Sequence, residues 1–246
     1  MYAELVCRSN YAFLRGASHP EELVSAAAAL GLSGLAITDD DGLYGLVKAH
    51  LEAKQQKLKL VLASRMTLLD APPIALYVQN AQGYAHLCEL ISESRLAHPK
   101  GSAGLPWQRV LQRAEGLAMV LLDDPARPHE HHVAAALAEA FAGRAYVGVS
   151  RHLCADDEAR FGTAKSLSRA LGLPLLAHND VHTHSRERQP LQDVMTAIRC
   201  GTTLANAGTL VFPNGERTLK SPDDMLRLFA DAPEAIGRTM EIVDGS

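Results

Sequence analysis

The sequence predicts an α/β fold, and its hydrophobic pattern is the reason. Short apolar runs rich in leucine and β-branched residues recur along all 246 residues, and a longer stretch of helical period follows each run. This alternation is typical of strand–helix units that build a parallel sheet. The predicted strands cover residues 4–8, 34–38, 58–64, 117–122, 144–149 and 174–178.

A seventh strand is expected at residues 74–79. It should pair antiparallel with residues 66–69, because Pro72 and Pro73 suit a tight turn between the two segments. Helices are expected at residues 84–94, 131–142, 157–171 and 191–200. Ser18 should begin an earlier helix through a capping box, and Ser221 should begin a late one.

Composition limits the classes of protein to which the chain can belong. The formal net charge is −4 with acids and bases mixed, so no basic footprint for a nucleic-acid duplex is present and any contact with DNA should be indirect. The four cysteines lie far apart without a CxxC pair, which fits reduced thiols in the cytoplasm. No apolar stretch is long enough to span a bilayer, so no membrane contact is expected.

We expect a single domain over residues 1–246. No linker, repeat or low-complexity block divides the chain, and its length suffices for one large core. Residues 221–246 are expected to be helical. Polar residues follow the predicted strands, and neither a G-x-G-x-x-G motif nor a P-loop is present. The ligand site of such a fold lies where the strands end.

Three segments carry a family resemblance: YAELVCRSNYAFLRG at residues 2–16, GLAITDDDGLYGL at 34–46 and GLPLLAHNDVHTH at 172–184. Together they resemble the polymerase and histidinol phosphatase (PHP) domain, in the form found in bacterial error-prone C-family DNA polymerases. The resemblance runs from end to end. It implies a distorted (βα)7, TIM-like barrel whose active members bind up to three metal ions and hydrolyse phosphoesters.

Most of the ligand positions that the resemblance implies are substituted here. The family's His-x-His on the first strand corresponds to Val6 and Arg8, and a glutamate after the third strand corresponds to Arg65. Arg15 stands where an acid or histidine is frequent, and Asp40 replaces the histidine of a Thr-Asp-His motif. Five residues remain as candidate metal ligands: Asp180, His182, Asp39, Asp40 and Glu4.

Arginines at these positions change the chemistry that the site can perform. Guanidiniums repel metal ions and attract carboxylates. We therefore expect Arg8 and Arg65 to pair with Asp39, Asp40 and Asp180 in place of a metal cluster. Strand alternation predicts that Glu4 faces the same side as residues 6 and 8.

Three functions remain open from the sequence. The first is a degenerate, non-catalytic PHP domain of an error-prone DNA polymerase III α-like subunit, without a cofactor. Its role would be structural or partner-docking in translesion DNA synthesis and repair, and its partners a polymerase body or other translesion-synthesis subunits. The second is a PHP phosphoesterase or 3′–5′ exonuclease that uses Mn or Zn. The third is a stand-alone protein that binds an anion through Arg8 and Arg65.

Overall fold

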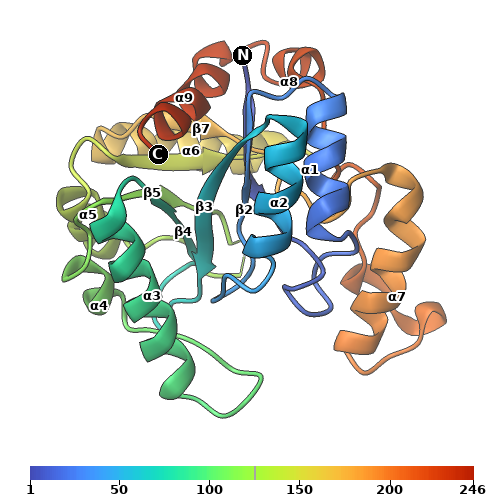
Figure 1. Cartoon of the computed structure of the whole chain (residues 1–246), viewed down its shortest axis with the longest axis horizontal. Helices are drawn as coiled ribbons and strands as arrows, with labels where there is room; N and C mark the ends of the chain where they lie inside the picture. The colour runs from blue at the N-terminus through green and yellow to red at the C-terminus, as the bar shows by residue number, and fades with distance from the viewer. Residues whose placement is uncertain (125) are drawn as a thin grey trace.

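Seven strands lie side by side in sequence order and form one curled sheet, with helices packed around it (Figure 1). The computed structural model describes residues 1–124 and 126–246. The strands are β1 (Ala3–Cys7), β2 (Gly34–Ile37), β3 (Lys59–Met66), β4 (Ile74–Val78), β5 (Leu117–Leu121), β6 (Ala145–Val149) and β7 (Leu175–Ala177). β4 runs antiparallel to β3 and β5, and all other neighbouring pairs are parallel. The predicted α/β fold with a distorted barrel is confirmed.

Helices follow most of the strands, as the sequence pattern predicts. They are α1 (Pro20–Ala29), α2 (Leu46–Gln56), α3 (Ala81–Leu96), α4 (Trp107–Leu111), α5 (His131–Ala140), α6 (Asp157–Leu171), α7 (Gln189–Arg199), α8 (Pro222–Leu228) and α9 (Pro233–Asp244). Short 3-10 turns precede and follow α7 at Arg186–Arg188, Leu204–Asn206 and Gly208–Leu210. Within the described ranges, no helix combines the length and the apolar character needed to cross a membrane.

Two local expectations are wrong in detail. Residues 63–66, not 66–69, pair with β4, because β3 continues unbroken to Met66 and Leu68 forms a bridge with Leu105 instead. The cap of α1 is His19, whose backbone N–H donates to the Glu22 carboxylate at 2.8 Å. Ser18 Oγ instead accepts a hydrogen bond from the backbone N–H of His184. The predicted cap of α8 is present, since Ser221 Oγ accepts from the N–H of Asp224.

The sheet separates two apolar regions. Alternate residues of β4 show this clearly: Leu76 packs in a cluster with residues of α3, whereas Tyr77 packs with Val120 and Leu5 in the interior of the curled sheet. Helix α9 adds Ile242 to that interior cluster. The last helix is therefore part of the core of this domain.

The two edge strands of the sheet, β1 and β7, are joined by the segment that follows β7. We call this junction the seam. Cys7 and Val181 form a parallel bridge, in which Arg8 N donates to Val181 O and Val181 N donates to Val6 O, both at 2.8 Å. Helix α9 contacts β7 and β1 on the same seam. The seam brings residues 178–182 next to the end of β1, where Arg8 lies.

Glu4 lies buried in this seam, with 1% of its surface exposed. Its carboxylate accepts hydrogen bonds from Tyr2 Oη at 2.7 Å, from Val6 N at 2.9 Å and from Asn179 N at 2.9 Å. Burial raises the pKa of Glu4 to about 7, although these donors oppose the shift. The group therefore titrates near neutral pH in the folded chain.

The raised pKa of Glu4 predicts a pH-dependent stability. The folded chain holds the Glu4 proton up to a higher pH than the unfolded chain, so this contribution is complete below pH 4.5 and is lost as the pH rises through about 7. In chemical denaturation, the unfolding free energy of the parent relative to Glu4→Gln should fall by up to about 3 kcal/mol between about pH 5 and pH 8. Other titrating groups cancel in this difference. A difference that stays constant over this range would contradict the assignment.

Candidate functional site

Charged side chains from four strand ends meet on one side of the sheet. Arg8 follows β1, Asp39 and Asp40 follow β2, Arg65 lies near the end of β3, and Asp180 follows β7. The ends of parallel strands share one edge of a sheet, so residues far apart in the sequence converge there. The backbones of Asp40 and Arg65 also form a bridge that fixes their relative position.

The carboxylate of Asp180 is bound by guanidiniums. Arg8 Nη1 donates to Asp180 Oδ1 at 2.8 Å, and Arg217 Nη1 donates to Oδ2. Arg65 Nη1 lies 3.9 Å from Oδ1. Burial alone would raise the pKa of Asp180, but Arg8 and Arg217 outweigh it and hold this pKa well below its ordinary value. Asp180 is therefore an ionised carboxylate at neutral pH.

The backbone at Asp180 turns sharply. Its φ of +43° lies in the left-handed region, which aspartate tolerates better than most residues. The N–H of Asp180 donates to His178 Nδ1 at 3.1 Å, and the next residue, Val181, pairs with β1. The turn at residues 178–181 therefore both connects β7 to β1 and holds the Asp180 carboxylate.

His182 is held as a neutral imidazole. Arg8 Nη1 donates to its Nε2 at 2.7 Å, so Nδ1 carries the proton and donates to Arg15 O at 2.6 Å. Burial, together with the positive charge of Arg8, lowers the pKa of His182 to about 4. Phe212 packs against the ring, with its centroid 4.9 Å away. The nitrogen lone pair that a metal would need already accepts from a guanidinium.

Asp40 is shared among three guanidiniums. The Nε atoms of Arg8, Arg15 and Arg65 each lie 3.4 Å from one of its carboxylate oxygens. These separations exceed the 2.7–2.9 Å typical of charge-assisted hydrogen bonds, so the three ion pairs are loose. Burial and the nearby Arg8 lower the pKa of Arg65 to about 10, which leaves it charged at neutral pH.

The predicted pairing of Arg8 and Arg65 with acids is therefore present for Asp40 and Asp180. It is wrong for Asp39, whose carboxylate accepts from Ser9 N at 2.7 Å and from Ser9 Oγ at 2.6 Å. Burial raises the pKa of Asp39 to about 6, and the Ser9 hydrogen bonds limit the rise. Ser9 reaches Asp39 because it is the second residue after β1.

Among the described residues, Glu4 forms no ion pair with the arginines of the site, although Asp180 is near enough to act on its charge. The register between β1 and β2 shifts between Glu4 and Cys7, so the strict alternation expected for residues 4, 6 and 8 is broken. Val6 packs with Leu5 in the interior cluster, and the donors to Glu4 belong to the seam. The Glu4 carboxylate is therefore satisfied by donors of the seam and not by Arg8 or Arg65.

Two hollows share part of this charged surface. The first, which we call the arginine cavity, has a volume of about 250 Å³. Its lining consists of six arginines, three aspartates and three other residues: Arg8, Arg15, Arg65, Arg160, Arg199, Arg217, Asp123, Asp124, Asp180, His182, Gln192 and Phe212. The second, of about 470 Å³, shares Arg8, Arg15 and Arg65 with the first and includes Asp40. Positive charge predominates in both.

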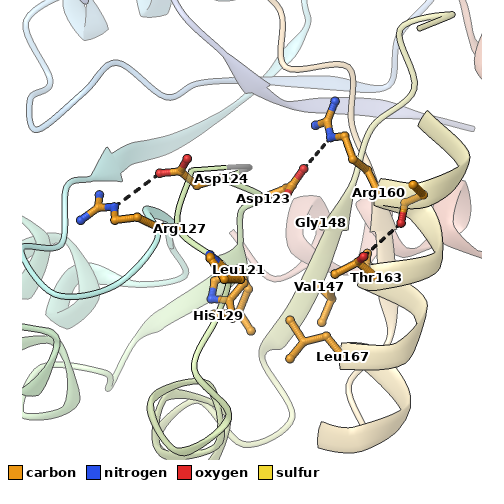
Figure 2. Close-up of a pocket in the computed structure, with 13 residues that line it drawn as sticks. Leu121, Asp123, Asp124, Arg127, His129, Val147, Gly148, Arg160, Thr163 and Leu167 are labelled. Carbon is orange, nitrogen blue, oxygen red and sulfur yellow. Dashed lines mark hydrogen bonds and ion pairs between the residues drawn. The ribbon is translucent and has the colours of Figure 1, made fainter. Parts of the chain in front are cut away.

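A third cavity, of about 330 Å³, lies between the ends of β5 and β6 and helix α6 (Figure 2). Apolar side chains such as Leu121, Val147 and Leu167 line much of it. At its edge, Arg160 Nε donates to Asp123 Oδ2 at 2.6 Å, as Figure 2 shows. Asp123 and Arg160 also line the arginine cavity, so this ion pair stands between the two spaces.

The sequence reasoning missed several residues that line the arginine cavity, among them Arg160, Gln192, Arg199 and Arg217. Arg217 and Gln192 come from a loop and from α7, and no strand end or motif marks them. The backbone does relate Arg217 to the site, because its carbonyl accepts from His182 N at 2.9 Å. Elsewhere, Cys154, Asp156 and Asp157 have ligand atoms within 4.8 Å of one another near the start of α6. Those three residues belong to one short stretch of chain, and none of them lines the arginine cavity.

The charge of Asp180 should be essential for stability. Asp180→Asn leaves Arg8 and Arg217 without their shared carboxylate, and breaking such a buried pair costs about 3–5 kcal/mol of unfolding free energy. A matched control is Glu89→Gln, which removes an exposed pair with Arg113 and should cost about 1 kcal/mol or less. Urea denaturation at neutral pH measures both losses. Equal losses in the two variants would contradict a central role for Asp180.

Known proteins resemble this chain over almost its entire length. Residues 4–152 match the PHP domain family. The error-prone DNA polymerase of Anaeromyxobacter dehalogenans strain 2CP-C is 43% identical over 257 aligned residues, which cover 99% of this chain and 22% of the relative. The error-prone DNA polymerase of Caulobacter vibrioides is 38% identical over 99% of this chain and 23% of the relative. The chain thus spans less than a quarter of the length of these relatives.

Solved structures agree on the fold. A predicted metal-dependent phosphoesterase from Bifidobacterium adolescentis superposes with a TM-score of 0.56 at 14% identity, covering 73% of this chain and 87% of that one. An amidohydrolase from Chromobacterium violaceum, solved with bound sulfate and no metal, gives a TM-score of 0.54 at 14% identity over 74% and 88% of the two chains. The seven-stranded fold, the family match over more than half of the residues and the relatives together show that the chain belongs to the PHP domain family.

Proposed function

We propose that the chain is a non-catalytic PHP domain of an error-prone DNA polymerase, with a structural and partner-docking role in translesion synthesis. The observation that carries the proposal is the set of guanidiniums bound to Asp180 and Asp40. They occupy the carboxylate oxygens through which a hydrolytic metal cluster would be held. The relatives support the polymerase context, since all of those compared are error-prone DNA polymerases.

The residues present fit a metal cluster poorly. Mn or Zn needs several carboxylates and neutral imidazoles that converge on one point. Within residues 1–124 and 126–246, the acids and histidine of this site form no group of three with ligand atoms within 4.8 Å. Arg8 lies against Asp40, Asp180 and His182 and adds a fixed positive charge at their centre. We therefore assign no hydrolytic step to these residues.

Metal analysis and hydrolysis assays test this proposal. Chain purified without added metal should hold far less than one equivalent of Mn or Zn. With either metal it should release no phosphate from phosphomonoesters and no nucleotides from the 3′ ends of DNA. The double variant Arg8→His, Arg65→Glu replaces two guanidiniums that contact Asp40 and Asp180 with ligand types implied for these positions, and it should gain metal relative to the parent. Stoichiometric metal in the parent, with turnover that Asp180→Ala and His182→Ala abolish, would establish a phosphoesterase instead.

A docking role is supported by the apolar face of α7. Leu191, Val194 and Ile198 follow one another at helical spacing and are 43%, 38% and 60% exposed. The opposite face buries the polar residues Gln192 and Thr196, so this helix is inverted relative to an ordinary surface helix. Helix α7 lies at the side of the barrel (Figure 1). Exposed apolar stripes of this kind mark protein contacts.

A chimaera tests the docking role. This chain would replace the matching 22% of the Anaeromyxobacter polymerase, and Val194→Lys with Ile198→Lys would be introduced on α7. We expect the double variant to lower the thermal stability of the chimaera by several degrees, about 1–2 kcal/mol, while leaving the isolated chain unchanged. Leu226→Lys, at a 42% exposed position of α8, is the control. Equal effects of the α7 and α8 variants on the chimaera would rule out this surface.

A further inference from the structure

The arginine cavity holds more hydrogen-bond donors than its own acids use. Arg8 and Arg217 donate to Asp180, and Arg160 donates to Asp123. Arg65 meets Asp40 at 3.4 Å and Asp180 at 3.9 Å, and Arg15 meets Asp40 at 3.4 Å, all outside the range of a charge-assisted hydrogen bond. These loose ion pairs leave guanidinium N–H groups available to another acceptor.

Gln192 and Arg199, both on α7, supply further hydrogen-bond donors to the cavity. Gln192 is 1% exposed and lines the arginine cavity, and its side-chain oxygen has no hydrogen-bond partner among the described residues. Rotating the amide exchanges the oxygen and the NH2 group, so Gln192 can also donate. Arg199 lines the same cavity from the last turn of α7 and is exposed to solvent. A buried amide without a partner is costly unless a ligand or water satisfies it.

Charge and size restrict the ligand. Six arginines and three aspartates line the arginine cavity, and His182 is neutral, so an anion is favoured. The volume of about 250 Å³ is smaller than that of sites that enclose drug-sized molecules, about 300–1,000 Å³. Guanidiniums that approach from separate elements match a tetrahedral group with several acceptor oxygens better than a planar carboxylate with two.

We propose that the arginine cavity binds a phosphate group, held by the guanidiniums of Arg15, Arg65 and Arg199 and by the side-chain amide of Gln192. Arg8 and Arg217 donate to Asp180 and offset its charge, so the carboxylate does not repel the anion. The inference deepens the proposed function and rests on it, because a phosphate here contacts arginines directly and requires no metal.

Titration calorimetry in a buffer free of phosphate and sulfate tests the site, with inorganic phosphate as the probe. We expect saturable binding with a dissociation constant at or below about 1 mM, weakened at least about tenfold by Arg65→Gln and by Gln192→Leu. Arg199→Gln is a second variant at an exposed position, for which folding is not at risk. Arg227→Gln removes an exposed arginine of α8 and should leave the affinity unchanged. Absence of saturation up to about 10 mM, or equal affinity in all variants, would overturn the proposal.

Further arms of the titration identify the source of the phosphate. Inorganic phosphate, deoxyadenosine monophosphate and a 5′-phosphorylated single strand share the group, and the unphosphorylated strand is the control. Tighter binding of the phosphorylated strand than of inorganic phosphate assigns the cavity to nucleic-acid ends. Tighter binding of the mononucleotide assigns it to nucleotides, and a preference for inorganic phosphate assigns it to the free ion. Tighter binding of the unphosphorylated strand than of all three would overturn the assignment to a phosphate group.

The same titration separates the two proposals. Binding that persists in EDTA and is lost in Arg65→Gln supports the arginine site and agrees with the absence of metal chemistry. Binding that EDTA abolishes would show that a metal holds the anion, and both proposals would then fail. A metal-free chain without phosphate affinity overturns only the phosphate site and leaves the docking role standing.

Discussion

The compensation of one partly buried negative charge, that of Asp180, organises this face of the barrel. Asp180 remains ionised although burial opposes its charge, because Arg8 and Arg217 contact its two oxygens. A buried charge without a partner costs several kcal/mol, so these arginines could not be exchanged freely once Asp180 was retained. The positions of His182 and Arg15 follow from the same contacts, since Arg8 also donates to the imidazole.

A metal ion and a guanidinium satisfy acids in different ways. A metal is exchangeable and draws several ligands onto one point, whereas an arginine is fixed to the chain and directs its donors in one plane. The loose sharing of Asp40 among three arginines shows the geometric result. Guanidiniums stand side by side around a space, and the space itself becomes positive. Arginines at these positions therefore favour the binding of an anion over that of a metal cation.

Much of the fold and part of the site could be predicted from the sequence. The strands were predictable because their apolar runs are continuous. Arg8 and Arg65 were predictable partners of acids because they stand at strand ends, in positions where the family resemblance implies metal ligands. The Ser9 contact to Asp39 was not, since hydrogen bonds from a loop leave no periodic pattern. The hydrogen-bond partners of Glu4 were not predictable, because a register shift in β1 breaks strict alternation. Arg217 and Gln192 reach the cavity only through tertiary packing.

Helix α7 carries both an outward apolar stripe and two residues that line the arginine cavity. A rigid helix cannot move one face without the other. If contact with a partner shifts α7, the affinity of the cavity for its ligand changes by a definite factor, and occupancy of the cavity changes the affinity for the partner by the same factor. Through α7, partner binding at the surface and ligand binding in the arginine cavity would therefore be thermodynamically coupled.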